Sequence, residues 1–482
     1  MIPKLDHAAA GPSPWPGIVP SFRVCLTAQE SRLAIPINWQ NLWLMPQPAR
    51  AMIVHLSREN RLRTRQPSHL GGSAASREAR RAQVNYHLSS ARKSQRRLLP
   101  RDGRRTSDAA PRSGVRARVA LRELAISLKK WAQSEQMMGR NYLSHQPFDS
   151  GLIRTVFGHA GVPAVTRILQ DRMIAGIGIN ELNDEIIVFT RKKLRGADKR
   201  VLSNAAITIG TQQISLVFRD GGLPFAGTVP PPPGAGIPAA TMHNGRYTCG
   251  SSIFIGSEKG AGTLGCLVRH RTDGTIYGLS NNHISGGCNY AVPGLPIVSP
   301  GSLDVAAGAQ DPETIGHHSL AYPFIDGLPE IVDASGNLDA AIFKIANLDR
   351  VSSMQRTAYD TPADCVPLEV GMRVQKVGRT TGSTHGEVVA EYPAFESIEY
   401  ELHLIDGKKQ VYFQNLFIIM ATPGEFAQPG DSGSLIVEVQ QNGPRRGVGI
   451  VVGTDGSGLT YALSLHRVLE HFNVDLVSNH NV

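Results

Sequence analysis

Short apolar runs separated by Gly, Asn, Asp and Pro fill the second half of the chain, from about Ala239 onwards. Their length and β-branched content predict strands, and the turn residues between them leave little room for helices. Many short strands of this kind predict a sandwich or a barrel. A helical period returns only at Ser464–Phe472. The predicted strands are Ser252–Ile255, Gly265–Arg269, Thr275–Ser280, Ala340–Ile345, Met372–Val377, Glu387–Ala390, Gln410–Phe413, Leu416–Met420, Leu435–Val439 and Gly447–Val452.

A different pattern precedes this β-rich part and predicts a small α+β domain at residues 148–224. One helix is predicted over Val162–Met173 and a second over Asp198–Ala206, whose first residue can cap the helix. Gly176 and Gly178 do not make a phosphate loop, because a third glycine or Gly-Lys-Ser/Thr is missing. We interpret them as part of a strand. Four predicted strands are Ile174–Ile179, Glu185–Thr190, Ile207–Gly210 and Gln213–Phe218.

Residues 1–147 carry the positive charge of the chain. The whole sequence has a net charge of +10, whereas residues 51–140 contain 21 Lys and Arg against 6 Asp and Glu, a net charge of +15. The rest is therefore mildly acidic. Lacking apolar periodicity, the Arg-rich part is predicted to be a disordered extension, and only Val119–Met138 fits a helix, loosely. A nucleic-acid-binding arm is the alternative, but Tyr86 is the only aromatic residue in 49–118, and base stacking needs aromatic side chains.

Consecutive prolines at 230–233 mark the clearest boundary in the chain. A Pro- and Gly-rich segment of this kind predicts an extended, fairly stiff linker. The predicted organisation is a basic extension (1–147), an α+β domain (148–224), a linker (225–238) and a β-rich domain (239–482).

A single serine, Ser432, stands between two glycines in Gly430-Asp-Ser-Gly433. Glycines let the backbone turn tightly, so that neighbouring N–H groups can converge on one developing negative charge. The same residue types also form ordinary turns. A serine nucleophile further needs a base and an oriented carboxylate. His283 follows a predicted strand and Asp339 precedes another, which gives the chain order His, Asp, Ser.

From about Gly250 to Leu476 the sequence resembles a trypsin-like (chymotrypsin-fold) serine protease of a bacterial type. The resemblance is carried by Gly262-Thr-Leu-Gly265, Leu279-Ser-Asn-Asn-His283, Val377-Gly-Arg-Thr-Thr-Gly382 and Gly430-Asp-Ser-Gly433. It implies a mainly β, chymotrypsin-like double β-barrel. It also implies that Ser432 is the nucleophile, His283 the general base and Asp339 the acid that orients it.

The resemblance implies further roles in the loop around the serine. The N–H groups of Gly430 and Ser432 would form the oxyanion hole. Asp431 would pair with Arg379, so that the site forms without zymogen cleavage; the alternative is that Arg379 is a surface residue of a Gly/Thr turn. The alternatives to the predicted base are His270, His317, His318, His385 and His466, and those to the acid are Asp333 and Asp349.

Substrate preference follows less directly from the resemblance. The specificity pocket would be lined near Phe426, Val452 and Gly453, which favours an apolar or small side chain. Glu425 leaves a basic side chain as the alternative. We expect peptide or protein substrates, and no metal or other cofactor, because neither a metal-ligand pattern nor a nucleotide loop occurs.

Cysteine usage and hydropathy bear on the location of the protein. Five cysteines do not make a disulfide framework; a Cys266–Cys288 bridge is conceivable, but free thiols are favoured. No apolar run approaches the ~20 residues of a membrane helix, and the N-terminus lacks a signal-peptide pattern. We expect a cytoplasmic protein without membrane contact.

The leading functional hypothesis is a serine endopeptidase that works through an acyl-enzyme. A catalytically silent protease fold that acts as a binding or regulatory module is the alternative. A protease tethered to nucleic acid through the basic extension is a weaker one.

Overall fold

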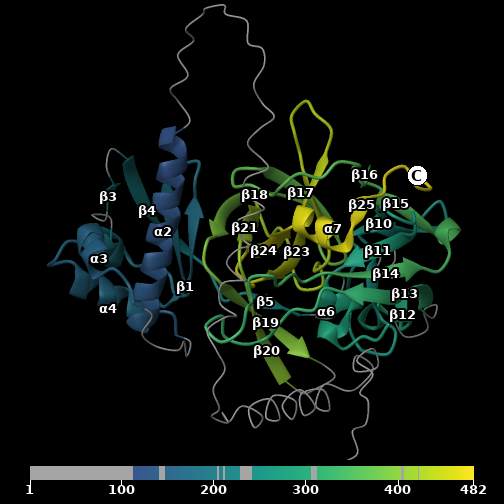
Figure 1. Ribbon diagram of the computed structural model, residues 1–482, viewed down its shortest axis with the longest axis horizontal. Coiled ribbons are helices and arrows are strands. Elements are labelled where there is room, and N and C mark those ends of the chain that lie inside the picture. Colours follow the sequence, from purple (N-terminus) through teal and green to yellow (C-terminus); the bar gives the residue numbers. More distant parts are fainter. Residues whose placement is uncertain are drawn as a thin grey trace, which may run out of the picture. The chain divides into compact units, whose positions relative to one another are not determined.

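The computed structural model describes residues 112–139, 147–202, 206–209, 212–227, 242–305, 312–402, 407–421 and 423–482 (Figure 1). The Arg-rich residues before 112 and the proline run 230–233 lie outside the described residues. The disorder and the nucleic-acid arm predicted for the Arg-rich residues therefore concern a part of the chain that is not described.

Six strands of the C-terminal region close into a barrel. Their bounds are β17 (Arg373–Gly378), β18 (Gly382–Tyr392), β21 (Leu416–Ala421), β22 (Leu435–Glu438), β23 (Arg446–Thr454) and β24 (Leu459–Ser464). Antiparallel pairing runs β17–β18–β21–β24–β23–β22 and returns to β17. Val374, Val388 and Ile419 are buried in one core cluster with neighbouring strands, as alternation along a strand requires. The helix α7 (Leu465–Phe472) follows directly.

A second, curled sheet forms a half-barrel beside it. Its order is β25–β10–β11–β14–β13–β12–β8–β9. The bounds are β8 (Ser252–Ile255), β9 (Gly262–Thr263), β10 (Cys266–His270), β11 (Ile276–Ser280), β12 (Pro296–Ser299), β13 (Glu313–Ala321), β14 (Ala341–Ile345) and β25 (Val474–Leu476). The predicted mainly β, chymotrypsin-like double barrel is thereby confirmed.

Short elements complete the two barrels. A small sheet has the order β16–β15–β7–β6. Its strands are β6 (Met242–His243), β7 (Arg246–Cys249), β15 (Val351–Gln355) and β16 (Tyr359–Asp360). The short helices are α6 (Asn282–Ser285), η3 (Gly287–Asn289), η4 (Ser302–Asp304) and η5 (Leu348–Arg350).

The α+β domain begins earlier than predicted. Its elements are α2 (Arg112–Ser134), α3 (Ser150–Phe157), α4 (Val162–Arg172), β1 (Ile174–Asn180), β2 (Glu185–Thr190), α5 (Gly196–Leu202), β3 (Ala206–Ile209) and β4 (Gln212–Asp220). The helix α2 falls in the segment predicted to be disordered, yet Leu121, Leu124 and Leu128 lie at i, i+3 and i+7 and are buried. Together they form a core with β1 and β2. Figure 1 shows α2 beside β1.

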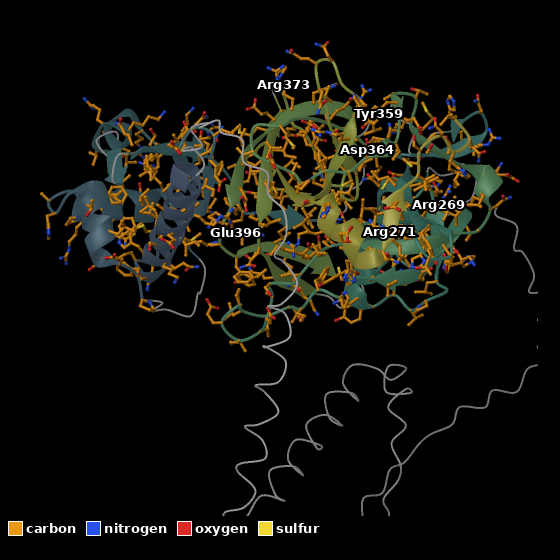
Figure 2. All side chains as sticks on the ribbon, turned by 45° about the horizontal axis from the view of Figure 1, so that its top comes forward. Arg269, Arg271, Tyr359, Asp364, Arg373 and Glu396 are labelled. Carbon is orange, nitrogen blue, oxygen red and sulfur yellow. The ribbon has the colours of Figure 1, made fainter. Side chains whose placement is uncertain are left out.

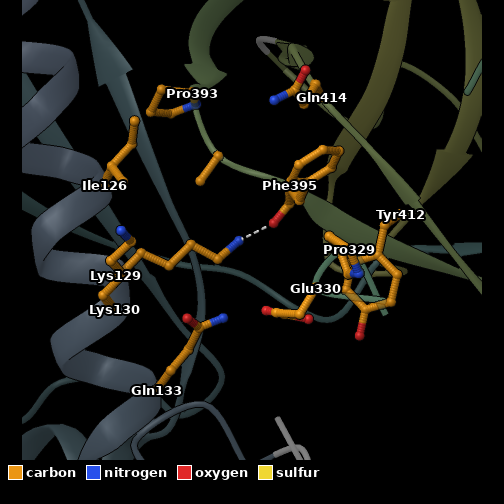
Figure 3. Close-up of a pocket in the computed structure, with 11 residues that line it drawn as sticks. Ile126, Lys129, Lys130, Gln133, Pro329, Glu330, Pro393, Phe395, Tyr412 and Gln414 are labelled. Atoms are coloured by element: carbon orange, nitrogen blue, oxygen red, sulfur yellow. Dashed lines mark hydrogen bonds between the residues drawn. The ribbon is translucent and has the colours of Figure 1, made fainter. Parts of the chain in front are cut away.

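This domain is joined to the closed barrel through a shared sheet. Ile179 of β1 pairs antiparallel with Glu391 of β18. Across the same junction, Lys129 of α2 lies 2.6 Å from the Glu396 carboxylate, with side-chain exposures of 4% and 1%. Lys129 also donates to the Phe395 carbonyl (Figure 3). Figure 2 labels Glu396 on the side of the barrel that faces α2.

A cavity of about 320 Å³ opens beside this ion pair (Figure 3). On one side it is lined by Ile126, Lys130 and Gln133 of α2, and on the other by Phe395 and Gln414 of the barrel. The junction therefore combines a charged, buried contact with an incompletely filled space.

The predicted linker boundary at 225 is wrong, because Phe225–Ala226 forms strand β5 of the large sheet. It pairs parallel with β19 (Glu396–Leu402) and antiparallel with β23. The strand β19 forms a hairpin with β20 (Gly407–Phe413). Two apolar residues are too short a run to be recognised as a strand in the sequence.

None of the helices in the described part of the chain combines the length and the apolar character needed to cross a bilayer.

The buried ion pair at the junction predicts that one lysine and one arginine substitution on α2 lower the unfolding free energy by different amounts. Lys129→Ala removes the buried cation that lies 2.6 Å from the Glu396 carboxylate, which costs about 3–5 kcal/mol of unfolding free energy. Arg122→Ala is the matched control and should cost less, because Arg122 and Glu391, 2.8 Å apart, are 35% and 12% exposed, so that water can partly replace the lost cation. Urea denaturation measures both; equal losses would contradict the assignment.

Candidate functional site

His283 and Asp339 meet in a buried hydrogen-bonded pair. Strand β11 pairs with β14, which brings the residues just after β11 and just before β14 together. His283 Nδ1 lies 2.6 Å from Asp339 Oδ2, and the His283 backbone N–H donates to Oδ1 at 3.1 Å. The amide of Asn281 donates to the Asp339 carbonyl at 2.7 Å. Two contacts to one carboxylate fix both the position and the orientation of the imidazole ring.

Tyr400 of β19 is a third partner of this pair that sequence reasoning missed. Its hydroxyl donates to Asp339 Oδ2 at 3.0 Å, and its ring lies 5.3 Å from the imidazole in an edge-on arrangement. Burial, and then the Asp339 carboxylate, raise the pKa of Tyr400 well above its ordinary value, so the hydroxyl keeps its proton and donates. No motif marks this tyrosine, because the β19–β20 hairpin has to fold first to bring it to Asp339.

The serine loop packs directly against the segment that carries His283. Gly433 has a φ of +93°, and a Cβ there would lie 2.4 Å from both Ser280 Oγ and the Thr263 carbonyl. Thr263 in turn donates its backbone N–H to the Ser432 carbonyl at 2.9 Å. Only glycine permits this approach. The folded chain therefore brings Ser432 next to the turn that holds His283.

Ser432 and His283 do not share a hydrogen bond in this arrangement. The Ser432 hydroxyl donates to the Val452 carbonyl at 3.1 Å. Within the described residues, His283 Nε2 is buried and has no hydrogen-bond partner. In this arrangement the Ser432 proton is therefore directed at the Val452 carbonyl and not at the imidazole.

The two predicted oxyanion donors lie in a tight turn. The N–H groups of Asp431, Gly433 and Ser434 donate to backbone carbonyls. Hydrogen bonds of the Gly430 and Ser432 amides do not occur among the described residues. Gly430 has a φ of +97°. The amides of Gly430 and Ser432 thus keep their donor capacity, which is what a site for a developing oxyanion needs.

Asp431 does not pair with Arg379 as predicted, but with Lys376. The Lys376 Nζ lies 3.0 Å from Asp431 Oδ2, and both side chains are fully buried. The reason is strand alternation: Lys376 and Gly378 of β17 share a face. A Cβ on Gly378 would lie 2.4 Å from Asp431 Oδ1, so this glycine makes room for the carboxylate. A lysine inside the predicted strand Met372–Val377 was the overlooked signal.

The Gly-Arg-Thr-Thr-Gly segment nevertheless binds Asp431, through its threonines. The backbone N–H groups of Thr380 and Thr381 donate to Oδ1 at 2.7 and 3.2 Å, and the Thr381 hydroxyl donates to Oδ2 at 2.7 Å. The Gln428 N–H donates to Oδ2 at 3.0 Å. Burial would raise the pKa of Asp431, but Lys376 and these hydrogen bonds outweigh it, and the pKa is lowered.

Arg379 points the other way and joins the two barrels. Its Nε and Nη2 atoms donate to the two oxygens of Asp304 in η4 at 2.6 and 2.5 Å, and both side chains are about 2% exposed. Ser252 of β8 donates to the same carboxylate at 2.5 Å. The predicted alternative of a surface arginine is also wrong, because this is a buried, bidentate ion pair.

The three residues predicted to line the specificity pocket have other contacts. Phe426 is fully buried in the core cluster of the closed barrel. Val452 accepts the Ser432 hydroxyl. Gly453 is covered by β5, because a Cβ there would lie 2.4 Å from the Phe225 carbonyl oxygen.

Two of the alternative bases, one of the alternative acids and the described cysteines have other contacts or surroundings. His270 pairs with Asp273 at 3.2 Å, and His318 is a buried residue of β13 whose pKa is lowered by burial. Asp333 is an exposed turn residue bonded to Ser335. The four described cysteines are Cys249, Cys266, Cys288 and Cys365, and all are free thiols; the conceivable Cys266–Cys288 bridge is not formed.

Comparisons with known proteins cover the part of the chain that holds this site. A model of the Nal1 C-terminal domain matches residues 338–479, which include Asp339 and Ser432. The protein NARROW LEAF 1 of Oryza sativa subsp. japonica is 25% identical over 291 residues, which are 50% of this chain and 47% of that protein. The chain thus spans about half the length of the curated relative that it matches.

Among solved structures, Thermobifida fusca protease A is 16% identical with a TM-score of 0.31, and covers 48% of this chain and 98% of its own. Cellulomonas bogoriensis chymotrypsin is 15% identical with a TM-score of 0.30, with the same coverage. Because these sequence identities and TM-scores are low, the fold assignment depends on the strand pairing described above.

The lowered pKa of Asp431 predicts a pH-dependent stability. An ordinary Asp has a pKa of about 3.9, and a carboxyl with a lower value in the folded state stabilises the fold above that pH and loses this effect as the pH falls through its folded value. The difference in unfolding free energy between wild type and Asp431→Asn should therefore be largest near neutral pH and shrink below about pH 4. Urea titrations across this range measure it.

Asp349→Asn is the control for this titration, because Asp349 is exposed. If the difference in unfolding free energy between wild type and Asp431→Asn stayed the same down to pH 2, the role of the charged carboxylate would be contradicted.

Proposed function

We propose that the protein is a serine endopeptidase with Ser432 as nucleophile, His283 as general base and Asp339 as the orienting acid. The observation that carries this proposal is the buried His283–Asp339 pair, whose 2.6 Å contact at Nδ1 leaves Nε2 without a partner among the described residues. A buried imidazole held in this way has one nitrogen available for proton transfer. The packing of the Ser432–Gly433 loop against Thr263 and Ser280 supports Ser432 as the hydroxyl that gives its proton to this nitrogen.

The proposed reaction follows the ordinary sequence of acyl transfer. The Ser432 hydroxyl leaves Val452, passes its proton to His283 Nε2, and its oxygen forms a bond to the scissile carbonyl carbon. The Gly430 and Ser432 N–H groups stabilise the oxyanion. His283 then protonates the leaving amine as the C–N bond breaks, and a water molecule activated by His283 hydrolyses the acyl-enzyme. Asp339, supported by Tyr400, stabilises the imidazolium cation in both steps.

A catalytically silent peptide-binding module is the second candidate. One observation favours it, namely that the Ser432 hydroxyl donates to the Val452 carbonyl and not to His283. In such a module the fold would bind an extended chain without cleaving it. Covalent labelling of Ser432 distinguishes the two candidates.

The proposal predicts that a small fluorophosphonate probe labels the full chain at Ser432. Ser432→Ala should abolish labelling, and His283→Ala should slow it by at least about 1,000-fold, because the base and the nucleophile act as a unit. Ser457→Ala, which removes an exposed serine from the turn between β23 and β24, is the control and should label at the wild-type rate. Mass spectrometry of the labelled peptide measures the site. Wild-type protein that stays unlabelled would favour the silent module.

Tyr400 is a positioning residue in this proposal, and its substitution has a specific signature. Tyr400→Phe removes a hydrogen bond to a charged group, worth about 1.5–3 kcal/mol. The maximal rate of fluorophosphonate inactivation should fall roughly tenfold or more, while the probe concentration for half-maximal rate stays the same, because Tyr400 contacts Asp339 and not the probe. Tyr359→Phe removes a buried hydroxyl without a partner in the described part and is the control. A change confined to the half-maximal concentration would contradict the assignment.

A further inference from the structure

The strand β5 lies where two barrel strands reach the candidate site. Figure 1 shows β5 between β23 and β19. Phe225 is opposite Thr454 in the antiparallel pairing with β23, and Ala226 is opposite Tyr400 in the parallel pairing with β19. Thr454 lies two residues, or about 7 Å, from Val452, whose carbonyl accepts the Ser432 hydroxyl. Tyr400 contacts Asp339 and His283.

The direction of β5 carries the chain toward Ser432. Since the pairing with β23 is antiparallel, increasing numbers along β5 correspond to decreasing numbers along β23. From Phe225 opposite Thr454, the chain therefore advances past Gly453 toward Val452. The close approach of the Phe225 carbonyl to Gly453, at 2.4 Å from a Cβ placed there, shows that β5 lies directly against this edge at Gly453.

The segment that leads into β5 is firmly attached. The Gly222 N–H donates to Asp455 Oδ2 at 2.6 Å, and the Pro224 carbonyl accepts from the Glu399 N–H at 3.2 Å. Ala226 is 3% exposed. An extended chain added to a free strand edge is a general mode of peptide recognition, and here the edge of β23 is already paired with a segment of the same chain.

We propose that β5 is a built-in competitive inhibitor, which occupies the edge of β23 that an extended peptide substrate needs. This inference rests on the proposed function for its physiological meaning, since it concerns the regulation of the same site. A peptide can pair with Gly453 and Thr454 only when β5 leaves, whereas a small reagent that needs Ser432 alone is not excluded. Strand β5 is thus part of the site, and the α+β domain that precedes it holds the inhibitor in place.

The first test measures binding and does not depend on catalysis. In the full chain carrying Ser432→Ala, Ala226→Pro removes an N–H and disfavours a central strand position. The probe is a fluorescent Leu-Pro-Phe-Ala-Gly peptide, the sequence of residues 223–227, with the reversed sequence as control. Fluorescence anisotropy should show at least tenfold tighter, sequence-dependent binding to the Ala226→Pro protein than to its parent. Equal binding to both proteins would overturn the proposal.

A second variant guards against misfolding of the first. Phe225→Cys with Thr454→Cys places two thiols on directly opposed strand positions, within the range of disulfide geometry. In otherwise wild-type protein, oxidation should reduce hydrolysis of an eight-residue peptide at least tenfold, while fluorophosphonate labelling of Ser432 continues and reduction restores hydrolysis; each single Cys variant is a control. If Ser432 is labelled but the disulfide leaves hydrolysis unchanged, the inhibitor assignment is overturned. If Ser432 is not labelled, the proposed function fails. The peptide-binding test then decides whether β5 blocks the edge of β23.

Discussion

The buried carboxylate of Asp431 is the constraint on which the rest of the site depends. A charge removed from water has to be compensated by a cation and by hydrogen bonds, or it destabilises the fold. Here the compensation comes from Lys376, from the amides and hydroxyl of the Thr380–Thr381 turn, and from the Gln428 amide. Each of these contacts fixes a different segment around one residue. The conformation of the Gly430–Ser434 turn is therefore determined from within the barrel.

A second buried ion pair ties the neighbouring segment to the other barrel. Arg379 follows directly on β17 but reaches away from Asp431 to Asp304 of η4, which also accepts from Ser252. The two buried cations, Lys376 and Arg379, thus pair with different carboxylates. One supports the serine loop, and the other holds together the two barrels that contribute Ser432 and His283.

Sequence reasoning identified the strands and the candidate triad for clear physical reasons. The apolar runs around β11, β14 and β22 are long enough to show strand periodicity, and His283, Asp339 and Ser432 stand at the ends of such runs. It assigned the partner of Asp431 wrongly, because the direction of a side chain depends on where a strand ends, and β17 ends one residue before Arg379. Tyr400 and β5 were missed, since both act through pairings between distant segments that no local pattern records. The helix α2 was underestimated because its apolar face follows an Arg-rich segment.

The short connection between β4 and β5 has a mechanical consequence. Strand β4 ends at Asp220 and β5 begins at Phe225, and between them Gly222 is bonded to Asp455. At about 3.3 Å per residue, this tether has little slack. The position of β5 is therefore coupled to that of β4, and through β4 to the α+β domain.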